Sequence, residues 1–343
     1  MRATRVTVRH LVSYRETKDM RALLCTEFGP VSALRVAEVP VPVPGDREVL
    51  IRVEAAGLNY PDALVVQGKY QVRPARPFVP GMELAGVVDA VGAKVTEFRP
   101  GDPVMASTAT GAFAERCAVP VEQVLPRPAP LASDLAAASL LTYGTTLHAL
   151  EDRARLRPGE TVLVLGAAGG VGTAAVSIAR LLGARVIAAA SSEARLEVCR
   201  KLGADFTIDY ATEDLRLRVK EITGGNGVDV VYDPVGGAYS EAALRSTAWA
   251  GRFLVIGFAS GEIPKIPLNL ALLNERSILG VYWGDWSRRD PRQSAAGLAR
   301  IAGWLTDGSL APVISARLAL ADVPQAMDDL LQRRVHGKLL VIP

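Results

Sequence analysis

The chain has 343 residues, with 39 basic and 36 acidic side chains and a hydrophobic fraction of 49%. This length favours two domains with a sizeable core, and the composition excludes a disordered chain. The net charge of +3 is small, and no basic stripe alternates with aromatic residues, so a nucleic-acid partner is not expected. No apolar run of about 18 residues lacks a charge or a glycine, so we expect no membrane span.

The cysteines and the N-terminal segment indicate the cellular compartment in which the protein is expected. Cys25, Cys117 and Cys199 are far apart and form no C-x-x-C motif. They predict no disulfide framework, and they favour a reducing, cytoplasmic compartment. Residues 1–19 are basic without a helix or strand pattern and lack the apolar core of a secretory signal. We expect a disordered leader there, with the first domain beginning at Met20.

The segment 20–124 shows short apolar runs separated by proline and glycine turns, which predicts a compact, mostly β unit. The expected strands are 21–25, 49–55, 83–91, 103–106 and 111–119. Helical spacing begins after Ser133, a candidate N-cap for a helix over 136–141, and a second helix is expected over 145–154.

Beyond residue 160 strands and helices alternate, which predicts a doubly wound parallel α/β sheet with helices on both faces. The expected strands are 162–165, 185–190, 206–209, 228–232, 252–256 and 277–282, and the expected helices are 193–202, 214–223 and 239–247. The remaining pieces resemble the first unit in character: helices over 293–305 and 323–331, strands over 314–318 and 338–342. We therefore expect the C-terminus to complete the N-terminal domain.

The most informative stretch is the turn after strand 162–165, which fits an A-x-G-x-x-G form of the dinucleotide fingerprint. Gly169 would let the backbone approach a pyrophosphate, and Gly172 would let helix and strand pack closely. The helix N-terminus offers free N–H groups to the phosphates. A glycine-rich turn alone is weak evidence for dinucleotide binding. Here, however, a strand precedes the turn and a helix and a second strand follow it, as the motif requires. The expected contacts are Ala168, Gly169, Gly170, Val171 and Gly172.

The end of the second strand bears on the choice of cofactor. An NAD site usually carries Asp or Glu there, whereas this chain has Ser191 and Ser192, with Arg195 one helical turn further. Hydroxyls and a guanidinium suit a 2′-phosphate, so we predict NADPH. Glu193 argues against this if it faces the phosphate; alternatively it faces solvent in the first helical turn. Arg195 is alternatively a solvated helix charge.

An ordered set of further motifs resembles the zinc-independent quinone oxidoreductase branch of the medium-chain dehydrogenase/reductase superfamily. The set comprises 57–62, 80–88, 101–104, 143–146, 233–237 and Gly337-Lys338. The resemblance covers nearly everything after the leader. It implies a GroES-like partial barrel from 20–144 and 288–343, and a Rossmann domain over 145–287. It also implies a cofactor in the cleft between them, and a homodimer formed through the sheet edge at strand 277–282.

The resemblance also bears on metal. Zinc-dependent relatives carry a cysteine near the Asn59 position and Gly-His-Glu where this chain has Gly81-Met82-Glu83. His10, His148 and His336 have no ligand-like neighbours, and a zinc site needs about three converging ligands. We therefore expect no metal, and hydride transfer to an acceptor that is already electron-poor: a quinone, an enone or an enoyl thioester.

Two catalytic candidates follow from the resemblance. Asn59 would donate its amide to an acceptor carbonyl; the alternative is a turn-capping asparagine. Tyr70 aligns with a tyrosine near the active site of several quinone reductases and would donate a proton or hydrogen bond; the alternative is packing under nearby prolines. Asp62 is expected to cap a helix. Leu64 replaces a second active-site tyrosine, which weakens a quinone preference.

Other cofactor contacts are implied by position alone. The residues expected to reach the cofactor are Thr145, Tyr210, Val235, Gly257, Phe258, Tyr282 and Lys338. For Lys338 a plain surface lysine is the alternative, and for Tyr282, with Trp283 and Trp286, the alternatives are an aromatic pocket wall or hinge packing.

Two other functions stay open at this point. An enoyl-CoA reductase of the acryloyl or crotonyl type would need a basic entry patch, for which Lys69, Arg73 and Arg76 are candidates. A non-enzymatic NADPH-binding sensor is the alternative of another class.

Overall fold

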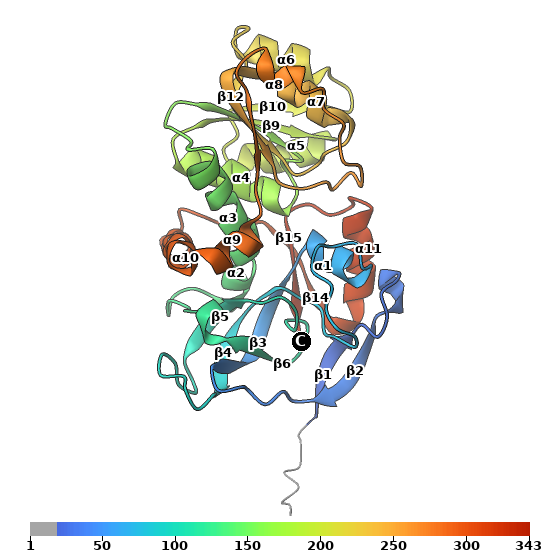
Figure 1. Cartoon of the computed structure of the whole chain (residues 1–343), viewed down its shortest axis with the longest axis vertical. Coiled ribbons are helices and arrows are strands. Elements are labelled where there is room, and N and C mark those ends of the chain that lie inside the picture. Colours follow the sequence, from blue (N-terminus) through green and yellow to red (C-terminus); the bar gives the residue numbers. More distant parts are fainter. Residues whose placement is uncertain (1–18) are drawn as a thin grey trace, which may run out of the picture.

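The computed structural model describes residues 19–343, and two sheets lie one above the other along its long axis (Figure 1). Residues 1–18, and with them almost all of the expected leader, lie outside the described residues. The first strand, β1 (Asp19–Leu24), pairs with β2 (Arg35–Pro40), a strand that the sequence did not predict.

The upper sheet has six strands in the order β10-β9-β8-β11-β12-β13, and every neighbouring pair is parallel. Its strands are β8 (Thr161–Leu165), β9 (Arg185–Ala190), β10 (Phe206–Asp209), β11 (Val228–Asp233), β12 (Thr247–Val255) and β13 (Ser277–Gly280). Every residue of β8 is buried, as expected of a central strand covered on both faces. The covering helices are α4 (Gly170–Leu181), α5 (Glu193–Lys201), α6 (Leu215–Ile222) and α7 (Ala238–Arg245). The predicted doubly wound sheet is confirmed.

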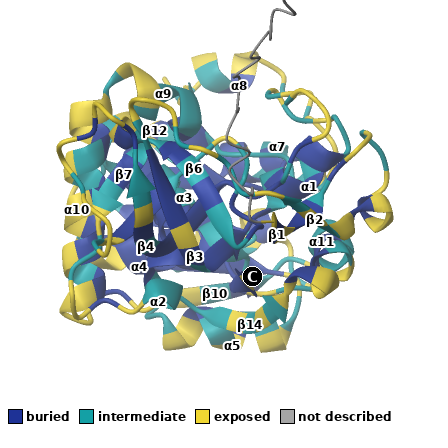
Figure 2. Ribbon diagram, turned by 90° about the horizontal axis from the view of Figure 1, so that it is seen from below, coloured by how far each residue is buried: buried dark blue, intermediate teal, exposed yellow. Residues whose placement is uncertain are grey.

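The lower sheet has the order β14-β15-β3-β4-β5-β7, with β6 also pairing with β3. Its strands are β3 (Glu48–Leu58), β4 (Glu83–Val91), β5 (Pro103–Ser107), β6 (Arg116–Pro120), β7 (Val124–Pro126), β14 (Ile314–Ala319) and β15 (Lys338–Ile342). The C-terminal strand β15 runs antiparallel to β3, with Leu339 opposite Leu58. The C-terminal strand therefore lies in the same sheet as the N-terminal strands β3 to β7. Figure 2 shows the buried strands of this sheet enclosed by exposed outer helices.

The remaining helices, with one exception, lie near the junction of the two sheets or beside the lower sheet; α8 (Asn269–Leu272) lies at the far end of the upper sheet, near α6 and α7 (Figure 1). These remaining helices are α1 (Tyr60–Val66), α2 (Ser133–Ala137), α3 (Leu140–Leu147), α8 (Asn269–Leu272), α9 (Trp283–Arg289), α10 (Pro291–Thr306) and α11 (Val323–Leu331). No helix within residues 19–343 is both long enough and apolar enough to cross a bilayer.

Several predicted boundaries were wrong. The helix expected over 136–141 is the end of α2 and the start of α3, and the N-cap of α2 is Ala132 rather than Ser133. The helix expected over 145–154 is α3 followed by a π-helical segment, His148–Arg153, whose wider turns sequence periodicity does not reveal. The strand expected over 277–282 ends at Gly280: the Val281 amide makes the last bond to β12, at the Val255 carbonyl, and α9 begins at Trp283. The strand expected over 111–119 begins only at Arg116, after a turn in which Gly111 has a positive φ of 109°.

Candidate active site

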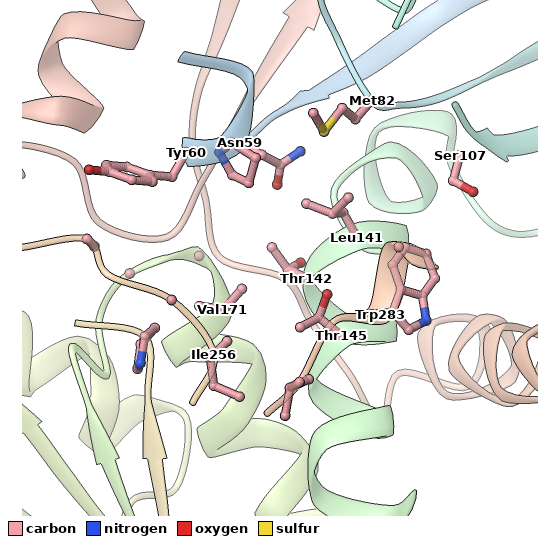
Figure 3. A pocket seen from close by; sticks show the side chains of 18 of the residues that line it. Asn59, Tyr60, Met82, Ser107, Leu141, Thr142, Thr145, Val171, Ile256 and Trp283 are labelled. Atoms are coloured by element: carbon pink, nitrogen blue, oxygen red, sulfur yellow. The ribbon is translucent and has the colours of Figure 1, made fainter. Parts of the chain in front are cut away.

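A cleft of about 640 Å³ lies between the two sheets, at the carboxyl ends of the parallel strands. Figure 3 shows its walls: Asn59 and Tyr60 come from the start of α1, and Thr142 and Thr145 from α3. Such a crevice is where open α/β sheets bind their ligands. It receives most of the residues that the sequence singled out.

The fingerprint turn forms the floor of the cleft. Gly169, Gly170 and Val171 line it, and a Cβ on Gly169 would meet only the Gly166 carbonyl, at 3.4 Å, so the surface beside it is open. Gly172 is buried instead, and a Cβ there would lie 2.2 Å from the same carbonyl, so α4 packs directly on the turn. Ala168 is also buried, and its carbonyl accepts the amide of Gly337 at 2.8 Å.

One end of the cleft gathers cations and hydroxyls. Ser191, Arg195 and Tyr210 line it, whereas Ser192 is the N-cap of α5 and does not. Burial raises the pKa of Tyr210, while the charges of Arg195 and Arg333 and a hydrogen bond with Ser191 lower it. These groups therefore share one small region.

Arg333 is the residue of this region that the sequence did not reveal. It follows α11, has a positive φ of 56°, and lines the cleft. Its carbonyl accepts a hydrogen bond from the Arg195 guanidinium, and its own guanidinium donates to the Ser260 carbonyl at 3.2 Å. The domain that contains the lower sheet thus adds a second cation beside Arg195. No local pattern signals this, because 138 residues separate the two arginines.

A buried carboxylate, Asp233, fixes the conformation of the loop after β11 through hydrogen bonds. Asp233 accepts the amides of Val235 at 2.8 Å and Gly236 at 2.9 Å, and the Ser240 hydroxyl at 2.6 Å. Gly236 and Gly237 both have positive φ, which explains the glycine pair in this motif. Val235 lies on the cleft wall together with other predicted contacts, Thr145, Gly257, Phe258 and Tyr282.

A buried polar network lies opposite the fingerprint turn. The Lys338 ammonium donates to Asn59 Oδ1 and to Glu83 Oε1, and all three side chains are at most 5% exposed. Glu83 Oε2 accepts the amide of Leu141 at 2.8 Å, which satisfies a free N–H in the first turn of α3. Gly57 leaves room for this carboxylate, since a Cβ there would lie 2.3 Å from Oε1.

This network fixes the direction of the Asn59 amide. Its Nδ2 donates to Glu83 Oε1 at 2.8 Å and to the Gly57 carbonyl at 3.3 Å. Both amide hydrogens therefore point at protein acceptors. Lys338 is a buried ion-pair partner rather than a surface lysine.

Asp62 is buried beside this network, and Tyr70 is half-buried. Asp62 Oδ2 accepts the backbone N–H of Asn59 at 2.8 Å, so Asp62 caps α1 as expected, while its Oδ1 has no hydrogen-bond partner within residues 19–343. Burial raises the pKa of Asp62 to about 7. Burial also raises the pKa of Tyr70 to about 12, with smaller effects from Tyr282 and Asp62, against which the charge of Arg288 acts.

The donor set does not fit a metal ion. Within residues 19–343, no group of three or more His, Cys, Asp or Glu side chains is placed to hold one. Met82 lines the cleft, and the neighbouring Glu83 carboxylate is already bound by Lys338 and Asn59.

Comparison with known proteins agrees with this geometry. Family models match residues 45–129 (alcohol dehydrogenase GroES-like domain) and residues 170–300 (zinc-binding dehydrogenase). A quinone oxidoreductase-like protein 2 homolog from Nematostella vectensis is 38% identical over 94% of this chain and 89% of its own length. A quinone oxidoreductase structure from Pseudomonas syringae is 31% identical, with a TM-score of 0.88 over 94% of this chain and all of that one.

A quinone oxidoreductase from Escherichia coli, solved with NADPH, is 27% identical, with a TM-score of 0.86 over 95% of this chain and 99% of that one. Fold and cleft thus define a two-domain oxidoreductase with a GroES-like and a Rossmann domain. The chain belongs to the quinone oxidoreductase branch of the medium-chain dehydrogenase/reductase superfamily.

The buried Asp62 predicts a pH dependence of stability. Its folded-state pKa of about 7 lies above the ordinary value of 3.8, so the native state holds a proton that the unfolded chain has released between these values. Stability therefore falls as pH rises from about 4 to 7, by at most about 1.4 kcal/mol per pH unit. Urea unfolding at pH 5 and pH 8 measures this effect. The free energy of unfolding of the wild type should be lower at pH 8 than at pH 5, and Asp62→Asn should lack this decrease.

The exposed Asp46 supplies the control for this measurement. Asp46→Asn should keep the wild-type pH dependence. Parallel stability curves for the wild type and Asp62→Asn would contradict the assignment.

Proposed function

We propose that this protein reduces a quinone or another α,β-unsaturated carbonyl with NADPH, without a metal. The observation that carries the proposal is the two-ended cleft. Its Ser191–Arg195–Arg333 end is cationic, and its other end is walled by apolar side chains. The first suits a phosphorylated nucleotide and the second a small conjugated acceptor.

The cofactor of this protein is NADPH, and the residues fit it. Arg195 and Arg333 supply two guanidinium groups for a 2′-phosphate, and Ser191 and Tyr210 supply hydroxyls. The backbone of Gly169, Gly170 and Val171, at the start of α4, would hold the pyrophosphate. When bound, NADPH supplies the hydride, and the product takes up one proton.

The acceptor end excludes water and positions the conjugated system. Leu141, Met82 and Trp283 line it and are mostly buried (Figure 3). Tyr70 would donate to the acceptor oxygen as negative charge develops, and its high pKa keeps it protonated at neutral pH. Asn59 would act by shape, because its amide hydrogens are held by Glu83 and Gly57.

The test is an acceptor panel of quinones, enones and enoyl thioesters, followed at the NADPH absorbance. We expect NADPH oxidation with at least one quinone or enone, unchanged after treatment with a chelator such as EDTA. Loss of turnover on chelation, restored by added zinc, would refute the metal-free mechanism. NADPH binding with no oxidation by any acceptor would favour a sensor instead.

The two arginines predict that their replacement weakens the binding of NADPH more than that of NADH. Arg195→Ala and Arg333→Ala should each weaken NADPH binding by roughly 10- to 100-fold and NADH binding far less, since each removes a charge-assisted contact of about 1.5–3 kcal/mol. Fluorescence titration of both cofactors measures the effect. Lys201→Ala, on the exposed face of α5, is the control and should change neither. Equal losses for NADPH and NADH would contradict the 2′-phosphate assignment.

We also propose a homodimer through the β13 edge of the parallel sheet. β13 is the edge strand of the upper sheet, and its Ile278 is 39% exposed. The segment before it exposes three leucines at 63–78%: Leu268, Leu272 and Leu273. An apolar, unpaired edge of this kind needs a covering partner, and a second copy supplies a matching edge.

The dimer is tested by light scattering. The wild type should have about twice the 36.4 kDa chain mass. Ile278→Asp should shift it toward the monomer, because the edge strand would then carry a charge at the interface. Val43→Asp, on the exposed surface of the other domain, should leave the mass unchanged. A monomeric wild type at micromolar concentration would refute the proposal.

A further inference from the structure

We propose that Arg288 selects acceptors that carry a negatively charged group, which it would bind at the opening of the acceptor end of the cleft. This inference rests on the proposed reductase function and narrows its substrate class. The shared chemistry is an oxyanion, either a carboxylate on the acceptor itself or a phosphate on a carrier attached to it.

The position of Arg288 is the first support. It lies near the end of α9, lines the cleft together with Tyr70 and Ser287, and its side chain is 53% exposed. It is therefore at the opening rather than the floor. Tyr70 lines the same cleft, and the charge of Arg288 acts against the rise in the pKa of Tyr70 that burial causes. An anion on Arg288 would thus be close to the group proposed to face the acceptor oxygen.

Incomplete charge pairing is the second support. Arg288 contacts Asp285 at 3.3 Å, but Arg289 contacts the same carboxylate at 2.6 Å. Two guanidinium groups therefore share one carboxylate, and the exposed pair is weak. Arg288 keeps donors for a ligand, since a guanidinium has five N–H groups in a planar fork.

The segment 69–76, which also borders the cleft, is the third support. Its Tyr70 and Val72 line the cleft, and its three cations, Lys69, Arg73 and Arg76, are exposed. Within the part of the chain that the structure describes, none of the three has a carboxylate within 4.0 Å. Tyr70 and Arg288 line the same cleft, so this segment adds uncompensated positive charge beside it.

Two acidic groups near this end, Glu122 and Asp62, do not offset the positive charge of the opening. Glu122 also lines the cleft, but it is bound to Arg47 at 2.8 Å. Asp62 is buried beneath the surface and accepts the backbone N–H of Asn59. The opening is therefore left with a surplus of positive charge, which favours anionic acceptors in both binding and approach.

The experiment compares matched pairs of acceptors on the whole protein with saturating NADPH. One pair is 4-oxo-2-pentenoate and its methyl ester, which differ in a carboxylate on the acceptor. The other is crotonyl-CoA and crotonyl-pantetheine, which differ in the phosphates of the carrier. The wild type should prefer the anionic member of at least one pair by roughly tenfold in kcat/KM, and that pair identifies the source of the charge.

Arg288→Gln should reduce this preference by roughly tenfold, mainly through KM, and Arg288→Lys should restore part of it. Arg289→Gln is the matched control: it is the next residue, it shares Asp285, and it does not line the cleft, so the preference should stay at the wild-type value. The preference of the wild type should also shrink as ionic strength rises.

The outcomes separate the two proposals. If neutral acceptors are reduced as fast as their anionic partners, or if Arg288→Gln and Arg289→Gln lower the preference alike, the role of Arg288 is refuted while the reductase function stands. If no acceptor of either pair and no quinone is reduced, the proposed function fails and this inference falls with it.

Discussion

The ion pair between Lys338 and Glu83 is the contact on which the cleft depends. It joins β15 to β4 across 255 residues of sequence, and both side chains are almost fully buried. Glu83 in turn caps α3, the helix that carries Thr142 and Thr145 into the cleft. A buried charge left without its partner costs about 3–5 kcal/mol, so each member of this pair holds the other in place. The wall of the site is therefore fixed before any ligand enters.

The same C-terminal segment also reaches the cofactor side. Gly337 bonds to Ala168 of the fingerprint turn, and the carbonyl of Arg333 accepts from Arg195. One short stretch of chain therefore contacts both the proposed pyrophosphate and 2′-phosphate regions while anchoring β15 to the lower sheet. Binding of a nucleotide would accordingly strengthen the association of the two domains, because its phosphates would bridge groups that belong to both.

The two ends of the cleft are built in different ways. The cofactor end consists of backbone groups and strand ends, whose positions follow from the sheet and vary little with side-chain identity. The acceptor end consists of side chains from α9, from α3 and from the segment around Tyr70. Under the proposed function, the choice of acceptor would depend on side chains of that end such as Arg288, Trp283 and Met82.

The sequence by itself determined the alternation of strands and helices, the fingerprint turn and the hydroxyl-and-arginine end of the second strand. These features follow from local spacing, and the carboxyl ends of adjacent parallel strands must meet, so Ser191 and Tyr210 were expected near the turn. Only the tertiary structure decided that Arg333 joins Arg195, that Lys338 is buried against Glu83, and that the Asn59 amide faces the protein. Those contacts join residues 24 to 279 positions apart. No local propensity encodes such pairs: Lys338, Glu83 and Asn59 meet only once strands distant in sequence have paired in the lower sheet, and Arg195 meets Arg333 only once the two domains have packed.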